Sequence, residues 1–383
     1  MSAIIIVGAG FSQPAGLPLG QSLFRELLDL AHTHGLYDNI LEPDISAYLE
    51  YLKASRGNTI SETDIDFEDF IAYLDLEHFL WLQGKETFTS SGNKSQMAIR
   101  NLIAILLYQR QSAAPIPNLD LYREFARRLR PWDWIISFNY DTLLETVFEE
   151  VGIKYRLVPD SLTSVNEFGG IAKYPDEDVV LLKVHGSIDW FDRTEFDEWL
   201  EDRKAHGYQG LPRHPVFEHP EECDVRPLSA GPYYPSSPLT RVYRARNLHT
   251  YFQRASYLLD CPLLISPSIH KLVYLNPLRE FWYGVSRIGY AETRMAIVGF
   301  SLPAHDEYLR LPLYHLVANY QFSHRGTYPD YPAKSRLVMV DKRVTKAEKA
   351  AYHKSFRFVR WANTVEYHEG FNREALNLIF EEQ

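Results

Sequence analysis

Four apolar runs that each end in glycine or small polar residues constrain the fold of this chain most strongly. In chain order, the runs and their ends are Ile4–Ser12, Ser137–Asp141, Lys183–Ser187 and Ile297–Ser301. A buried parallel strand has this pattern when its carboxyl end opens toward a ligand crevice. Because parallel strands end at the same edge of a sheet, the four ends together predict a nucleotide site.

The first run gives the clearest physical signal. The four β-branched residues Ile4–Val7 leave no polar alternation, which predicts a strand covered on both faces. Gly8 and Gly10 then allow a tight turn beside a ligand, although a turn without a ligand is the structural alternative. Apolar residues recur at helical spacing from Leu19 to Ala31, so the positive end of this helix is predicted to face a pyrophosphate.

The glycine turn departs from the common dinucleotide fingerprint. Gln13 stands where the third glycine would be. Asp29 is a poor ribose-binding acid, because it lies inside the predicted helix and not at the end of a second strand. A hydride-transferring dehydrogenase is therefore disfavoured.

Strand and helix patterns alternate along the later chain. Leu263–Ile265, Met295–Val298 and Leu337–Val340 are predicted strands with helical patterns between them. This alternation predicts an α/β fold, a Rossmann-like doubly wound parallel sheet with right-handed crossovers. Residues 346–383 are predicted to be a C-terminal extension with a helix, a short strand at Phe356–Trp361 and a terminal helix near Asn372–Phe380.

Two inserts are predicted to interrupt the sheet domain, which comprises residues 1–35 and 126–345. Residues 36–125 carry three helical periodicities and are predicted to be a helical insert that could cover the crevice. Residues 190–254 are predicted to be a loop-rich insert with a short hairpin at most, since prolines interrupt any long helix. These prolines are Pro212, Pro215, Pro220, Pro227, Pro232, Pro235 and Pro238.

Composition indicates a globular chain. The 383 residues are 45% hydrophobic and 14% aromatic, which argues against disorder. No apolar run approaches the ~18 residues of a membrane span, and the N-terminus lacks the features of a signal peptide. We therefore expect a cytoplasmic protein without a membrane partner. Cys223 and Cys261 form neither a disulfide framework nor a four-cysteine metal site, so no metal is expected.

The formal charge of −10 makes direct nucleic-acid binding an unfavourable interpretation. Two local clusters are basic although the chain as a whole is acidic. The first lies at helical spacing and is interpreted as a solvated helix face. It comprises Arg123, Arg127, Arg128 and Arg130. The second comprises Arg241, Arg244 and Arg246, and either a partner or a phosphate would suit it.

Taken in order, the motifs G-A-G-F-S, F-N-Y-D, H-G-S and G-F-S-L-P resemble the sirtuin superfamily. They look most like its zinc-free bacterial branch, the sirtuin-like NAD hydrolases of anti-phage defence. The resemblance extends as separate islands from residue 1 to about 345. It is partial, because Phe138 replaces the glutamine that precedes the family's asparagine, and because the zinc module of the protein deacylases is missing.

The resemblance implies a role for each motif residue. Asn139 would lie at the nicotinamide ribose, Asp141 near the carboxamide, and His185 would be the catalytic base. The implied cofactor-binding residues are Gly8, Ala9, Gly10, Phe11, Ser12, Gly16, Pro18, Gly299, Ser301 and Asp341. Within that set, Gly299 and Ser301 would approach the adenosine half of NAD, and Asp341 would approach the adenine ribose.

These residue types also suit the chemistry on their own terms. Breaking the bond between nicotinamide and ribose builds oxocarbenium-like charge, and the pyridinium leaving group needs little acid catalysis. A neutral histidine can accept a proton from the ribose hydroxyl or from water, and an amide can hold either one without changing charge. The structural alternatives are a strand-end histidine bonded to backbone for His185 and a helix N-cap for Asn139.

The resemblance implies an NAD⁺ hydrolase that releases nicotinamide and ADP-ribose and acts as a regulated NAD-depleting effector in anti-phage defence. NAD would be the substrate, without a metal. The alternatives are an NAD-dependent protein deacylase and a partner-gated sensor of NAD or ADP-ribose. The implied partners are further copies of this chain in a homo-oligomer and a separately encoded hexameric motor ATPase or Argonaute-type activator.

Overall fold

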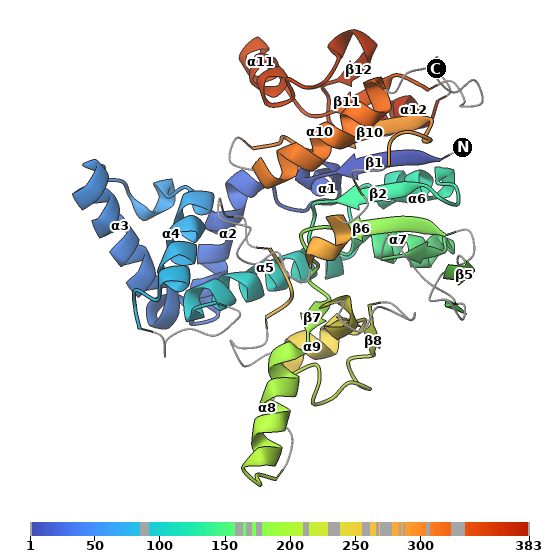
Figure 1. The fold of residues 1–383 in the computed structure, drawn as a ribbon. Coiled ribbons are helices and arrows are strands. Elements are labelled where there is room, and N and C mark those ends of the chain that lie inside the picture. The colour runs from blue at the N-terminus through green and yellow to red at the C-terminus, as the bar shows by residue number, and fades with distance from the viewer. Residues whose placement is uncertain are drawn as a thin grey trace.

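A parallel sheet dominates the computed structural model of this protein (Figure 1). Residues 2–84, 92–157, 164–165, 171–173, 178–209, 214–228, 238–254, 261–265, 268, 278–282, 285, 288–303, 307–322 and 334–381 are described. Within these ranges the sheet has seven strands in the order β12-β11-β10-β1-β2-β6-β3, and each neighbouring pair is parallel. The strands are β1 (Ala3–Val7), β2 (Trp134–Ser137), β3 (Tyr155–Arg156), β6 (Val179–Lys183), β10 (Arg294–Val298), β11 (Leu337–Val340) and β12 (Thr364–Tyr367).

The chain winds outward from β1 in both directions. It first adds β2, β3 and β6 on one side of β1, and later adds β10, β11 and β12 on the other side. Strands β1, β6, β10 and β11 are buried along their whole length, as continuous apolar runs require. The predicted Rossmann-like, doubly wound α/β fold is confirmed. The carboxyl ends of β1 and β10 meet where the direction of winding reverses, which is the usual place for a ligand crevice.

Helices flank the sheet. They include α6 (Leu119–Arg128), α7 (Leu143–Val151), α10 (Glu307–Phe322), α11 (Lys346–Ser355) and α12 (Arg373–Phe380). Helix α6 packs against α7 and α12, and α12 packs against β10 and β11. The C-terminal segment is therefore part of the sheet domain, because it supplies both an edge strand and a covering helix.

The segment between β1 and β2 is mostly helical. After α1 (Ala9–Ser12) and α2 (Gly20–Thr33) come α3 (Glu42–Arg56), α4 (Phe67–Leu80) and α5 (Lys94–Ser112). The three predicted helical periodicities are thus confirmed. Side-chain caps define two of the starts, since Asp66 accepts from the α4 backbone and Asn93 forms a capping box with Gln96 at α5. Helices α2 to α5 lie beside the sheet (Figure 1).

The segment after β6 is more regular than its prolines predicted. It contains β7 (Trp190–Asp192), α8 (Thr194–Ala205), β8 (Val225–Pro227), β9 (Val242–Ala245) and α9 (Leu248–Arg254). The three strands form an antiparallel sheet in the order β7-β9-β8. The prolines allow this because Pro227 ends β8 and Pro238 begins a 3₁₀ turn, which leaves α8 free of proline. Pro212, Pro232 and Pro235 lie outside the described residues.

This small sheet has an apolar core of its own. The core comprises Phe191, Phe196, Val216, Phe217, Cys223, Ala245 and Tyr251, all buried. A further antiparallel ribbon pairs β4 (Ser164–Val165) with β5 (Ile171–Lys173). None of the helices that the structure describes combines the length and hydropathy that a membrane span needs.

Two predicted strands are wrong. Leu263–Ile265 is not a strand of the sheet, because within it only Leu264 forms an isolated antiparallel bridge, to Gly186. The C-terminal strand is Thr364–Tyr367 and not Phe356–Trp361. Phe356 and Val359 are both buried, but a turn after α11 buries them, so the aromatic pattern was mistaken for strand alternation.

Candidate functional site

Three glycines join the carboxyl ends of β1 and β10, and we call Gly8, Gly10 and Gly299 the glycine junction. Gly8 N donates to Val298 O (3.0 Å) and Gly10 N donates to Gly299 O (2.9 Å). A Cβ atom at Gly8 would lie 2.7 Å from Gly299 O, and one at Gly299 would lie 2.2 Å from Phe11 N. Gly299 also has a φ of +63°. The glycines are therefore required first because two backbones touch here.

The turn after β1 differs from the predicted helix. Helix α1 has only four residues, a 3₁₀ turn follows at Gln13–Ala15, and α2 begins at Gly20. Pro14 and the left-handed Gly16 (φ +83°) separate the two helices. The amino end of α2 therefore does not follow the strand directly, and the helix that does follow it is the short α1.

Asn139 ties the end of β2 to the glycine turn. Its Nδ2 donates to Gly8 O and to Ser12 Oγ, both at 2.9 Å, and its side chain is only 7% exposed. The helix N-cap alternative is wrong, because α7 begins at Leu143 with Thr142 in the N-cap position. The amide therefore connects two of the four motifs.

His185 follows the end of the neighbouring strand β6 and is 6% exposed. Its Nε2 forms a hydrogen bond with the hydroxyl of Tyr308, a side chain of α10. Gly186 allows the turn because it has a φ of +83° and because a Cβ there would lie 1.9 Å from Leu263 O. Ile265 N donates to His185 O (2.9 Å), so the 263–265 segment fixes the histidine backbone.

Aromatic rings surround the His185 imidazole, and we call Phe138, Trp282, Phe300 and Tyr308 the aromatic cluster. Phe138 lies 5.1 Å from His185 and 4.3 Å from Phe300, measured between ring centroids. Trp282 contacts Phe138 and Tyr308 at 6.4 and 6.3 Å. The indole N–H of Trp282 is buried and has no hydrogen-bond partner among the described residues, which leaves one donor for a ligand oxygen.

Asp141 lies two residues after Asn139 and is 8% exposed. Its Oδ1 accepts from Leu143 N at 3.1 Å. Burial raises the pKa of the Asp141 carboxyl, while Lys183 and the Leu143 amide act in the opposite direction. A buried carboxyl with a raised pKa can bind the N–H groups of an amide or exchange a proton.

Beneath these loops lies a group of buried charges that we call the charge network: Glu145, Lys183, Asp189 and Arg244. Lys183 Nζ lies 3.0 Å from Glu145 Oε1, and both side chains of this ion pair are 1% exposed. Burial raises the pKa of Glu145. Burial acts in the same direction on Asp189, but Arg244 and Lys183 outweigh it and lower the pKa of that carboxyl.

Three other predicted cofactor residues lie in different surroundings. Phe11 is buried and packs against Tyr122, Phe125 and Phe371, so its ring belongs to the core. Ser301 is exposed just after the glycine junction. Asp341 ends β11, but its carboxylate already accepts from Arg343 Nη2 (2.7 Å) and Lys342 N (2.8 Å).

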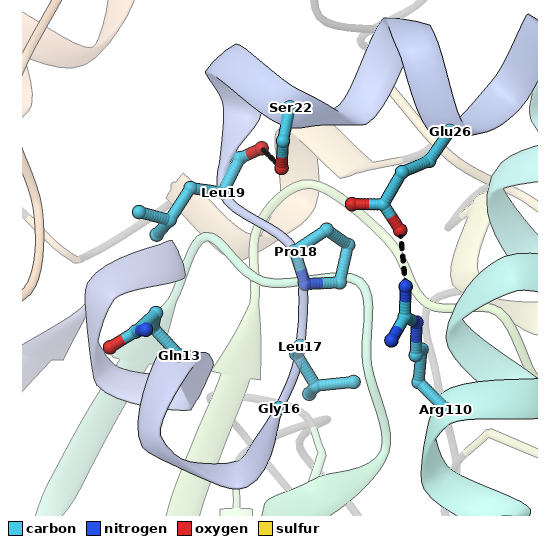
Figure 2. Close-up of a pocket in the computed structure, with 8 residues that line it drawn as sticks. All are labelled: Gln13, Gly16, Leu17, Pro18, Leu19, Ser22, Glu26 and Arg110. Carbon is cyan, nitrogen blue, oxygen red and sulfur yellow. Dashed lines mark hydrogen bonds and ion pairs between the residues drawn. The ribbon is translucent and has the colours of Figure 1, made fainter.

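Gly16 and Pro18 line a cavity of about 350 Å³ with six other residues (Figure 2). Those six are Gln13, Leu17, Leu19, Ser22, Glu26 and Arg110. This cavity does not include Asn139, Asp141 or His185. We take the buried groups as the candidate site because they carry the chemistry, and the cavity as its neighbour, since Gln111 next to Arg110 hydrogen-bonds Thr142.

The sequence did not point to Trp282 or Tyr308, because neither lies in a motif. The basic cluster of Arg241, Arg244 and Arg246 is also explained in part. Arg244 pairs with Asp189 and Glu149, and Arg246 pairs with Glu149, so internal carboxylates occupy two of its three guanidinium groups. Among the described residues, no group of three or more His, Cys, Asp or Glu is placed to hold a metal ion.

Residues 133–202 match the family model of the SIR2-like domain. The matched segment contains Asn139, Asp141 and His185. The match supports the sirtuin-like superfamily and implies NAD-dependent activity in general terms. A solved structure described as "The Structural basis of Sirtuin Substrate Affinity" was also found. The alignment covers 99% of this chain and 92% of the chain in that structure, at 12% sequence identity and a TM-score of 0.29. No curated protein matches the chain.

Proposed function

We propose that this protein is an NAD⁺ hydrolase that releases nicotinamide and ADP-ribose. One observation carries the proposal. An amide, a buried carboxyl and an imidazole, from Asn139, Asp141 and His185, follow two adjacent strand ends and lie beside the glycine junction. The match of this same segment to a SIR2-like domain supports NAD as the substrate.

The proposed reaction breaks the bond between C1′ of the ribose and the nicotinamide nitrogen. Nicotinamide leaves with the electron pair, water adds its oxygen to C1′, and the proton lost from water is accepted by His185 and passed to solvent. Asn139 holds the ribose or the attacking water, and Asp141 binds the carboxamide. The aromatic cluster would surround the pyridinium ring, whose positive charge suits aromatic faces.

The proposed enzyme is regulated, because its candidate catalytic groups are closed in this structure. Asn139, Asp141 and His185 are buried, and Tyr308 occupies the imidazole nitrogen that would accept a proton. NAD turnover then requires Tyr308 to leave Nε2. An enzyme that depletes cytoplasmic NAD must be inactive until triggered, which suits a role as an effector of anti-phage defence.

The activator proposed for this role is a separately encoded motor ATPase or an Argonaute-type protein, and self-association of the chain is proposed as well. The end of α4 supports self-association, since it exposes a run of large apolar side chains. They are Leu76, Phe79, Leu80, Trp81 and Leu82.

The test of the proposed function is product analysis. Purified protein is incubated with NAD⁺, and nicotinamide and ADP-ribose are measured by chromatography. His185→Ala is expected to lower the rate by about 10²–10⁴-fold, because it removes the proton acceptor. His353→Ala is the matched control, since that histidine is more exposed and pairs with Glu366 on the far strand β12. Full activity of His185→Ala would remove histidine from the mechanism.

The same assay separates the alternatives. Nicotinamide release that depends strictly on an acylated peptide would identify a deacylase. NAD binding without release in any condition would identify a sensor.

Asn139→Ala is expected to reduce turnover more than binding, and a large loss of NAD affinity with unchanged turnover at saturation would contradict the role given to the amide.

A further inference from the structure

One ammonium group holds both loops of the candidate site. Lys183 is 1% exposed and lies two residues before His185. Its Nζ donates to the backbone oxygen of Asp141 and to Ser187 Oγ, the latter at 2.6 Å. The loop that carries Asn139 and the turn that carries His185 are therefore both bonded to the same buried ammonium group.

The contact continues into the small sheet. Ser187 Oγ accepts from Lys183 and donates to Asp189 Oδ1, and Asp189 Oδ2 accepts from Arg244 Nε. Arg244 lies on β9, the central strand of the β7-β9-β8 sheet, and only 15% of its side chain is exposed. The backbone follows the same path, because Ala245 N donates to Asp189 O at 2.8 Å.

A network of this kind contributes geometry more readily than stability. The charge network contains two cations and two anions and is neutral overall. Desolvation of buried ions offsets most of their attraction, and well-packed apolar residues are often as stabilising. The directional contacts of Lys183 and Asp189, by contrast, fix where two loops stand relative to one strand.

We propose that Asp189 and Arg244 are positioning residues, which act through Ser187 and Lys183 to couple the β7-β9-β8 sheet to the loops of Asn139 and His185. A displacement of β9 would then move the site, which gives the small sheet a regulatory role. The kinetic part of this inference rests on the proposed NAD hydrolysis, whereas the mechanical coupling does not.

Arg244→Gln tests the coupling, with Arg246→Gln as the matched control. Arg246 lies two residues further on and contacts the same partner, Glu149, at 3.2 Å against 3.3 Å for Arg244. Among the ion pairs of the described residues, Asp189 pairs with Arg244 and not with Arg246. Amide hydrogen exchange is measured over residues 137–145 and 183–189, together with kcat and KM for NAD⁺. Arg244→Gln is expected to speed exchange in both loops and to lower kcat about tenfold with KM within about twofold. Arg246→Gln is expected to change neither, and Arg244→Lys, which keeps the charge, is expected to restore most of kcat.

Unchanged exchange in the two loops of Arg244→Gln would overturn the inference, as would faster exchange with an unaltered kcat in an active enzyme. If the wild-type protein neither turns over nor binds NAD⁺, the proposed function fails, and the exchange data alone decide the coupling. Should Arg244→Gln not fold, Asp189→Asn replaces it, because that variant removes the charge and keeps the shape.

Discussion

The two sides of the candidate site are held together by opposite means. At the glycine junction, β1 and β10 end in loops whose backbones touch, so no side chain fits between them. At the ends of β2 and β6, buried charges connect the loops instead. The first side depends on shape and tolerates no added atom, whereas the second depends on charge and tolerates changes that preserve it. One edge of the sheet therefore combines a rigid half with a half that tolerates substitutions.

The largest expected loss of stability is at Gly299, on the side that depends on shape. Gly299→Ala is expected to reduce the free energy of unfolding by about 4 kcal/mol, because a Cβ 2.2 Å from Phe11 N adds overlap to the strain of a positive φ. Gly152→Ala is the control, since Gly152 has a φ of +77° and nothing within 4 Å of its Cβ. It is expected to lose only about 1 kcal/mol. Equal losses in urea denaturation would show that contact between the loops does not matter.

The charged side is tested by Lys183→Met. This change leaves the Glu145 carboxylate buried without its cation, and we expect a loss of about 3 kcal/mol in the free energy of unfolding. Adding Glu145→Gln removes the leftover charge and should recover about half of that loss. A single variant that loses less than about 1 kcal/mol would mean that the ion pair has little influence on the fold.

The smallest expected effect is a pH dependence of stability that comes from His214, a buried residue that contacts Phe191 of the β7-β9-β8 sheet. Burial, with Arg193 nearby, lowers the pKa of His214 to about 3. Its Nδ1 accepts from Val216 N and Phe217 N at 3.2 and 3.3 Å, which suits the neutral ring. As pH falls below about 6.5, the unfolded chain binds a proton that the folded chain does not, so stability declines by at most about 1.4 kcal/mol per pH unit.

Between pH 6.5 and pH 5 the expected loss from His214 is therefore about 2 kcal/mol. His214→Asn offers an acceptor oxygen that does not titrate, so it should remove this part of the pH dependence. Denaturation curves of both proteins at the two pH values give the comparison. The same decline in wild type and variant would assign the acid sensitivity to other groups.

The sequence predicted the sheet well because continuous apolar strands are a local signal. The runs at Ile4 and Ile297 are too apolar for any but central strands, and both strands lie side by side within the sheet. The prediction of a strand at Leu263–Ile265 was wrong, because a short apolar run also suits a buried segment that forms one bridge to Gly186.

Contacts between distant segments could not be predicted. Tyr308 and Trp282 reach His185 and Phe138 through tertiary packing that leaves no periodic trace in the sequence. The partner of Arg244 was equally hidden, because Asp189 lies 55 residues away. The glycines were correctly singled out, but the reason given for them was incomplete, since backbone contact between loops and approach of a ligand leave the same sequence signal.

The packing of Phe11 has a consequence for biosynthesis. Its ring lies 4.5 Å from Phe371, between centroids, and that partner is 360 residues further along the chain. Domains fold as their residues leave the ribosome, and a contact of such long range must wait for both ends. The turn that follows β1 packs on Tyr122 and Phe125 early, but it gains its contact with Phe371 only after that residue has been made, so the core around Phe11 is completed long after the strand that precedes it.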